Sequence, residues 1–365
     1  MSGSIYGKHF SIATWGESHG KGIGVVVDGC PAGLELCEED IQKFLDRRKP
    51  GQSKFTTQRN EADAVKILSG TFEGKTTGTP ISMVVFNETQ RSSDYSEIAN
   101  YYRPGHADLT YDMKYGFRDY RGGGRSSGRE TIGRVAAGAI AIKILNTLGV
   151  DIFAYSKSIG PINCDPEKFS REEIMNNKLY MADAEAAAKA SDYLAQCMAE
   201  RNSSGGIIEC IVKNMPAGVG EPAFEKLSAN LAKAICSIGA VKGFEIGDGF
   251  DVATATGLTN NDNYEIKDGK VCKLTNRSGG ILGGISDGSD IILRAAMKPT
   301  PSIASTQHTF NKQGENIDIN IKGRHDPIIV HRAVVVVESM TALCLVDMLF
   351  ESMTSKMDDI VKFFR

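Results

Sequence analysis

The distribution of hydrophobic and polar residues along the chain predicts a mixture of strands and helices. Short apolar runs bounded by turn residues are typical of strands, and they occur over residues 5–15, 22–28, 65–69, 81–87, 151–158, 206–213, 243–247, 290–297 and 316–321. Helical patterns cover residues 38–48, 130–148, 183–201, 223–237 and 334–353. Because strands and helices do not alternate strictly, the pattern favours α+β layers over a doubly wound parallel sheet.

The clearest predicted helix spans residues 130–148 and is rich in small side chains, among them Gly133, Gly138 and several alanines. Small residues let a helix approach its neighbours closely. Gly149 is a suitable residue to end it. We therefore expect this helix to be buried on most sides.

Composition agrees with a packed globular protein. Of 365 residues, 41% are hydrophobic and 24% are charged, which are ordinary values. No Pro/Ser-rich linker or charge block divides the chain, so a single domain over 1–365 is expected. The longest uncharged apolar stretches fall short of the roughly 20 residues that span a bilayer. The N-terminus has no signal-peptide pattern, so a cytoplasmic protein is expected.

The balance of charge and the cysteines exclude two further classes. Lys and Arg number 42 against 45 Asp and Glu, for a net charge of −3, and a nucleic-acid binder usually carries a cationic excess. The eight cysteines are scattered, without CxxC or zinc-ligand spacing, so no metal site is predicted. Most of them occupy apolar runs, where a reduced thiol acts as a small core residue.

Glycine is the unusual residue: 39 of 365, about 11%, against roughly 7% in typical proteins. One cluster, Gly16-Glu17-Ser18-His19-Gly20, lies between two predicted strands. Its glycines allow a sharp turn, and an imidazole there suits general acid chemistry near neutral pH. The alternative is a polar turn with an exposed histidine.

A second cluster lies in the segment 103–134, which holds seven Arg and Lys against four acids, a local charge of +3 with histidine neutral. Gly122-Gly123-Gly124 and Arg125-Ser126-Ser127 lead into the predicted helix at Glu130. Free backbone N–H groups, a helix start, hydroxyls and guanidinium groups together predict a phosphate or carboxylate site. Neither GxxxxGK[ST] nor GxGxxG spacing is present. The alternative is a solvated, arginine-rich loop.

Two later segments add candidates. The glycine-rich segment 278–286 precedes Lys298-Pro299-Thr300-Pro301-Ser302, and paired glycines allow close approach to a flat ligand. Taken alone, it also fits a glycine-rich hairpin. Segment 323–327 (Gly-Arg-His-Asp-Pro) offers an anion ligand and an acid/base group, or a capped turn. A Ser-His-Asp hydrolase is disfavoured because Ser18 and His19 are adjacent and no GxSxG elbow occurs.

These segments together closely resemble the chorismate synthase family over essentially the whole chain. The matching motifs, in order, are GESHGKGIGVVVDGCP, RPGHAD, YRGGGRSSGRET, VKGFEIGDGF, GGILGGI, KPT and GRHDP followed by RAVVVVESM. Departures are small: Gly128 stands where the family more often has alanine, Ile328 where a smaller residue is usual, and Lys54 where arginine is frequent.

The resemblance implies the anti-1,4-elimination of phosphate from 5-enolpyruvylshikimate 3-phosphate to give chorismate, the last step of the shikimate pathway. It also implies reduced FMN (FMNH2) as cofactor without net redox change, and a homotetramer with a β-α-β sandwich of helices packed between antiparallel sheets. Both ligands are polyanions, which agrees with a site rich in Arg, Ser and Gly. NADPH is left open as an indirect reductant, because the chain shows no flavin reductase domain.

The resemblance also implies residue roles. His19 would protonate or stabilise the leaving phosphate, His106 would maintain the protonation state of the flavin, and Asp326, aided by Ser18 and Ser127, would relay a proton. The substrate's anionic groups would bind Arg48, Arg103, Arg129 and Arg324. FMN would contact Arg125, Ser126, Ser127, Gly239, Ala240, Gly283, Lys298, Pro299, Thr300, Pro301, Ser302 and Arg324.

Two other functions remain as alternatives. A flavin-dependent oxidoreductase acting on a phosphorylated small molecule would leave the flavin oxidised after each turnover. A non-catalytic phospholigand- or RNA-binding module would bind RNA without flavin, although the near-neutral charge and dispersed aromatic residues disfavour it.

Overall fold

Two antiparallel sheets form the outer layers of the protein in a computed structural model, which describes residues 3–51, 62–87, 97–321 and 326–365. One sheet has the order β1-β2-β3-β7-β4, with strands Ile5–Tyr6, Ser11–Gly16, Gly22–Asp28, Ile81–Phe86 and Val65–Ile67. The other has the order β11-β16-β10-β8-β9, with strands Val241–Ile246, Ile291–Met297, Gly206–Lys213, Asp151–Ile159 and Ile162–Asn163. Neighbouring strands pair antiparallel in both sheets.

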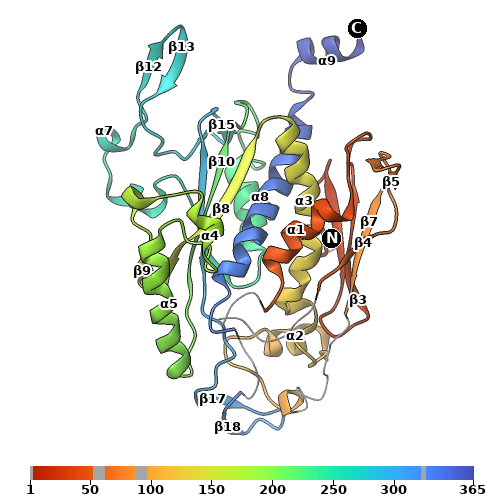
Figure 1. Ribbon diagram of the computed structural model, residues 1–365, viewed down its shortest axis with the longest axis vertical. Coiled ribbons are helices and arrows are strands. Elements are labelled where there is room, and N and C mark those ends of the chain that lie inside the picture. The colour runs from red at the N-terminus through yellow and green to blue at the C-terminus, as the bar shows by residue number, and fades with distance from the viewer. Residues whose placement is uncertain (1–2, 52–61, 88–96, 322–325) are drawn as a thin grey trace.

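A layer of helices lies between the two sheets (Figure 1). Helix α3 (Thr131–Thr147) packs on β3, and α8 (Val330–Ser352) packs on β8 and β10. Helix α1 (Glu38–Arg48) lies against both of these helices, and α6 (Leu227–Cys236) packs on α8 and β11. The α+β class and the β-α-β sandwich are therefore confirmed.

The small residues of α3 have the predicted effect. A Cβ atom added at Gly138 would lie 2.2 Å from the Cβ of Ser339 on α8, so the two helices cross at a distance that only glycine permits. Thirteen of the 17 residues of α3 are buried, and Gly149 adopts φ +76° just beyond its end. The predicted burial and the glycine stop are both confirmed.

A buried ionic contact joins the layers. Glu338 on α8 is 3% exposed and accepts two hydrogen bonds from Arg47 of α1, at 2.7 and 2.8 Å. The same carboxylate accepts the backbone N–H of Ala154 in β8 at 2.9 Å. Because a buried carboxylate is stable only when its oxygens are paired, this contact fixes α1, α8 and β8 relative to one another.

Helix α8 is long and apolar enough to cross a membrane, the one such helix within the described ranges. Of its most apolar window, 89% is buried inside the protein. Its apolar side chains therefore belong to the core between the sheets.

Smaller elements lie at the two ends of the sandwich. In Figure 1, hairpin β12–β13 and helix α9 project at one end, while α2 and hairpin β17–β18 lie at the other. The bounds are α2 (Asp108–Tyr115), α4 (Glu173–Asn176), α5 (Ala184–Ala199), α7 (Gly257–Asn260), α9 (Met357–Phe364), β5 (Thr71–Phe72), β6 (Lys75–Thr76), β12 (Tyr264–Lys267), β13 (Lys270–Lys273), β14 (Ile281–Leu282), β15 (Ile285–Ser286), β17 (Gln307–Phe310) and β18 (Asn316–Ile319).

The sequence predictions differ from the structure in a few places. The predicted strand 5–15 is two strands, β1 and β2, because the chain turns at Gly7, where φ is +89°. Helix α6 begins at Leu227 rather than near residue 223. Helix α8 begins at Val330 rather than at the expected residue 334. The elements that were not predicted are strands β5, β6, β9, β12, β13 and β17 and helices α2, α4, α7 and α9. All eight cysteines are free thiols, and four of them are buried.

Candidate active site

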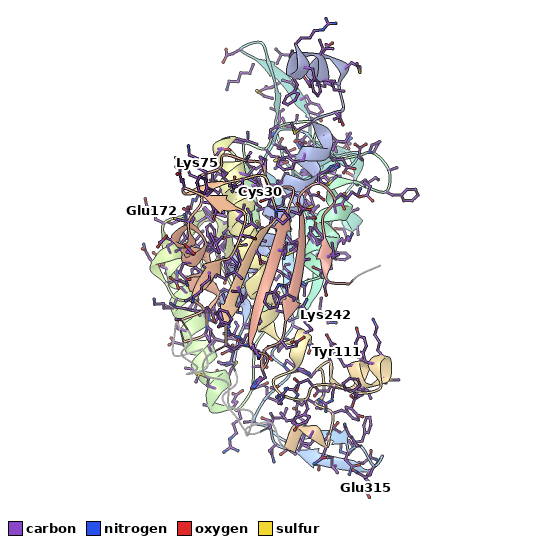
Figure 2. All side chains as sticks on the ribbon, turned by 90° about the vertical axis from the view of Figure 1, so that its right-hand side faces the viewer. Cys30, Lys75, Tyr111, Glu172, Lys242 and Glu315 are labelled. Atoms are coloured by element: carbon purple, nitrogen blue, oxygen red, sulfur yellow. The ribbon has the colours of Figure 1, made fainter. Side chains whose placement is uncertain are left out.

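A cavity of about 1270 Å³ opens where α2, the glycine-rich segment before α3, and the N-terminal end of α8 meet the C-terminal end of α6. Among the described residues that line it are eight lysines and arginines but only two carboxylates, Glu130 and Asp326. Figure 2 labels two of its lining residues, Lys242 near the end of the sandwich and Tyr111 of α2 beside it. This excess of cations suits a polyanionic ligand.

The triple glycine shapes one wall of this cavity. Gly122, Gly123 and Gly124 have φ values of +66°, +90° and +54°, in the left-handed region that favours glycine. Two short 3₁₀ turns, Gly124–Ser126 and Gly128–Glu130, follow and lead into α3. The predicted helix start at Glu130 is thus one residue early, and the seryl groups lie in these tight turns before the helix.

His19, the first candidate histidine, packs behind this wall together with Ser18. Ser18 and His19 are 2% and 4% exposed. A Cβ atom on Gly122 would lie 2.5 Å from Cδ2 and 2.7 Å from Nε2 of His19, and 2.8 Å from Oγ of Ser18. Gly122 lines the cavity, whereas Ser18 and His19 are not among its lining residues and lie next to this glycine.

His106, the second candidate histidine, lies in the cavity wall beside Gly123. A Cβ atom on Gly123 would lie 3.1 Å from Cε1 of His106. His106 Nδ1 lies 2.8 Å from Oδ1 of Asp108 and 3.1 Å from Nη2 of Arg103. Nδ1 can make only one of these hydrogen bonds, and we assign it as a donor to the nearer carboxylate. The neutral ring then has its lone pair at Nε2.

Asp108 is the centre of a buried ionic cluster. Its carboxylate also accepts from Arg103, at 2.7 and 2.8 Å, and pairs with Arg118 at 3.0 Å. Burial raises the pKa of the Asp108 carboxyl, but the hydrogen bonds from Arg103 and His106 outweigh it and hold that pKa well below its usual value. Asp108 is therefore an anion at neutral pH, and it orients both Arg103 and His106.

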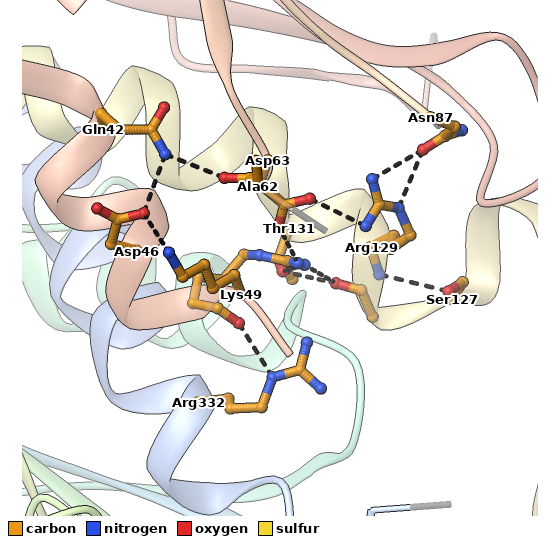
Figure 3. Close-up of polar contacts among 12 residues, drawn as sticks. Gln42, Asp46, Lys49, Ala62, Asp63, Asn87, Ser127, Arg129, Thr131 and Arg332 are labelled. Atoms are coloured by element: carbon orange, nitrogen blue, oxygen red, sulfur yellow. Dashed lines mark hydrogen bonds and ion pairs between the residues drawn. The ribbon is translucent and has the colours of Figure 1, made fainter. Parts of the chain in front are cut away.

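Two of the predicted substrate arginines meet at a second buried carboxylate, Asp63 (Figure 3). Arg48 Nη2 lies 2.8 Å from Oδ2 of Asp63, and Arg129 Nη1 lies 3.0 Å from Oδ1. Burial lowers the pKa of Arg48 to about 10, although the neighbouring Asp63 carboxylate acts to raise it. Arg48 therefore remains a cation at neutral pH. Arg129 lines the cavity, whereas Arg48 lies behind that lining and donates to the carbonyl of Gly128.

The residues predicted to contact the flavin line another part of the cavity. They are Arg125, Ser126, Ser127, Gly239, Ala240, Lys298, Thr300, Pro301 and Ser302. Ala240 has φ +72°, which is uncommon for a residue with a Cβ. Among the described residues, chain neighbours aside, no atom lies within 4 Å of the position that a Cβ on Gly239 would occupy, which leaves room for a ligand.

Asp326 also lines the cavity and forms an ion pair with Arg332 of α8. Arg332 donates from Nε to the carbonyl of Arg48 at 3.0 Å. Pro299 and Gly283 are not among the lining residues, and Gly283 lies in the turn of hairpin β14–β15. Arg324 and Lys54 lie outside the described residues.

Sequence reasoning missed several residues of the site: Asp63, Asn87, Asp108 as an orienting group, and Arg332. Asp63 has a left-handed φ of +46°, and Asn87 directly follows β7. Arg332 is the first residue of the RAVVVVESM motif, so the motif could have indicated it. Neither Asp63 nor Asn87 stands in a motif, so no local pattern could have indicated them.

Comparisons with known proteins fit this geometry. The chorismate synthase family model matches residues 10–350. The chorismate synthases of Agathobacter rectalis and Lachnospira eligens are each 67% identical to this chain over 365 residues, covering all of both chains. That of Methanosarcina barkeri is 54% identical over 96% of this chain and 97% of its own.

A crystal structure of a chorismate synthase has the same fold. Its TM-score with this chain is 0.76 at 31% sequence identity, over 98% of this chain and 97% of that one. The fold and the cavity thus define an α+β enzyme with a cationic ligand cavity. The chain belongs to the chorismate synthase family, whose members are lyases of the shikimate pathway and of aromatic biosynthesis and use a flavin cofactor.

Proposed function

We propose that the cavity binds reduced FMN together with 5-enolpyruvylshikimate 3-phosphate and eliminates phosphate to give chorismate. The observation that carries this proposal is the convergence of eight cations, the glycine-rich wall and His106 on one cavity. Phosphate and carboxylate groups on both ligands require such donors. The donor set and the open space at Gly239 fit a flavin phosphate and ring.

Reduced FMN supplies the electron density and the hydrogen acceptor that side chains lack. Arg129 and Arg103 bind the anionic groups of the substrate. Arg48 lies behind the residues that line the cavity and acts on these groups from there. Arg125, Ser126, Gly239, Ala240 and the segment 298–302 bind the flavin. Pro299 and Arg324 complete the proposed flavin contacts, and Arg324 also binds the substrate. Gly283 does not line this cavity, because its hairpin turn lies at the start of α6, where Gly284 accepts from the N–H of Leu227.

Three acid/base groups act in this proposal. His19 would protonate or stabilise the leaving phosphate, which requires its ring, now behind Gly122, to come within hydrogen-bond distance of that phosphate when the ligands bind. His106, with Nδ1–H held by Asp108, presents Nε2 to the flavin side of the cavity. Asp326, aided by the hydroxyls of Ser18 and Ser127, would relay onward the proton that the flavin has taken up. Groups in such positions contribute on the order of 10² to 10⁴ in rate.

A histidine substitution tests the site directly. His106→Ala should lower turnover by at least roughly tenfold while the protein still folds, because the group that maintains the protonation state of the flavin is lost and Asp108 keeps its arginine partners. Turnover is measured anaerobically as phosphate release, and folding by thermal melting. As a matched control, His308→Ala removes an exposed histidine on β17 and should leave turnover unchanged. A His106→Ala enzyme with wild-type turnover would remove His106 from the mechanism.

We also propose a homotetramer of single-domain, cytoplasmic chains, with NADPH as the indirect reductant of FMN. Exposed apolar side chains such as Phe224 and Leu258, each 96% exposed, support self-association. Light scattering measures the assembly, and a monomeric mass at micromolar concentration would refute the tetramer.

A further inference from the structure

Asn87 occupies a position between two parts of the proposed site. It follows β7, whose last residue, Phe86, pairs with Gly22 at the start of β3. This register places Asn87 beside the turn 17–20 that precedes β3. Its backbone N–H donates to the carbonyl of Lys21 at 3.1 Å, which fixes the residue at the end of the strand pair.

The amide nitrogen of Asn87 closes the turn that carries Ser18 and His19. Nδ2 donates to the carbonyl of Glu17 at 3.1 Å and to that of Gly20 at 2.9 Å. Within the turn, the N–H of Gly20 donates to the carbonyl of Glu17 at 3.1 Å. One side chain thus holds both ends of the turn, and the direction of the His19 ring depends on that turn.

The amide oxygen of Asn87 faces the substrate arginine (Figure 3). Oδ1 accepts from Nη2 of Arg129 at 2.8 Å and from Nε at 3.1 Å. The remaining terminal nitrogen, Nη1, pairs with Asp63 at 3.0 Å. Asn87 and Asp63 therefore hold the guanidinium from two sides, and Arg129 is only 6% exposed.

We propose that Asn87 is a positioning residue that couples the His19 turn to the substrate-binding Arg129. Only a primary amide offers two donors on one side and an acceptor with two lone pairs on the other. A carboxylate would keep the contact with Arg129 but would face the carbonyls of Glu17 and Gly20 without a donor. The inference rests on the proposed role of His19, which the experiment tests separately.

The test uses Asn87→Asp, which separates the two halves of the contact. Because the acceptor for Arg129 remains, KM for the substrate should stay within about threefold. Because the turn loses both donors and the ring moves, kcat should fall at least tenfold, since a displacement of 1 Å can cost about 10²-fold. Asn87→Leu, close in size and uncharged, should lower kcat and also raise KM.

Double variants show whether the effect passes through His19. In a His19→Ala enzyme, adding Asn87→Asp should lower kcat by less than about twofold, because the group being positioned is already absent. In a His106→Ala enzyme the same addition should keep its full effect of at least tenfold. A purely structural role would lower kcat equally in both backgrounds.

Each outcome has one meaning. Asn87→Asp with wild-type kcat, or with a raised KM and unchanged kcat, overturns the inference while leaving His19 in place. A His19→Ala enzyme with wild-type turnover overturns the proposed role of His19, and the coupling falls with it. If Asn87→Asp melts well below the wild type, Asn87→Leu serves the same comparison, and equal losses in both histidine backgrounds overturn the inference.

Discussion

Replacing Gly122 by alanine tests whether the glycine wall positions the first histidine. The new Cβ would lie 2.5 Å from Cδ2 of His19, whereas carbon atoms pack at about 3.5–4.0 Å. The ring must therefore move by about 1 Å, or the wall must move by the same amount. A displacement of 1 Å can cost about 10²-fold in rate, so we expect kcat to fall about 100-fold.

The same substitution also has a backbone cost. Gly122 has φ +66°, and alanine in this region is less stable than glycine by about 1–2 kcal/mol. Typical domains have about 5–15 kcal/mol of stability, so the variant should fold, with a slightly lower melting temperature. Gly123→Ala should lower kcat less, because its Cβ would lie 3.1 Å from His106 and needs a shift of only a few tenths of an ångström.

Gly128→Ala is the matched control in the same segment. Apart from its chain neighbours, no atom of the described part of the chain lies within 4 Å of its added Cβ, and its φ is outside the left-handed region, so kcat should be unchanged. The assay is anaerobic phosphate release with reduced FMN, beside thermal melting of each variant. A Gly122→Ala enzyme with wild-type kcat, or a Gly128→Ala enzyme that is equally slow, would refute the reasoning.

Two further predictions concern stability. Asp63→Asn should lower the unfolding free energy, measured by urea titration, by about 3–5 kcal/mol because two buried guanidinium groups lose the carboxylate that balances their charge; a change below 1 kcal/mol would contradict this. His331 is 1% exposed, and burial, then Arg332, lowers its pKa to about 4. Because the unfolded chain takes up a proton near pH 6.5, stability should fall by about 3 kcal/mol between pH 7 and pH 4 from this group. His331→Leu should remove that component, and an unchanged pH profile would contradict it.

Much of the fold could be predicted because its elements carry strong local patterns. Strand β16 alternates buried and half-buried residues along its length, as a strand with one face on the helix layer must. The close packing of helix α3 could be predicted from its small residues, such as Gly138. Strand β17 and helix α9 were missed because they are short and carry little of the buried core.

Residues of the site could be predicted only where they belong to a sequence motif. His106, Arg129 and Gly122 belong to such motifs, and the structure places them at one cavity. Asp63 and Asn87 come from the ends of other segments and reach the site through tertiary contacts alone. His331 carries no motif signal, and it is buried without a hydrogen-bond partner among the described residues.

The central claim is a phosphate elimination in which the flavin is not consumed. The most direct measurement is an anaerobic reaction of the protein with 5-enolpyruvylshikimate 3-phosphate and dithionite-reduced FMN, following chorismate, phosphate and flavin absorbance together. The account predicts one chorismate and one phosphate per substrate, with the flavin still reduced after many turnovers. One flavin oxidised per turnover, or no release of phosphate, would contradict it.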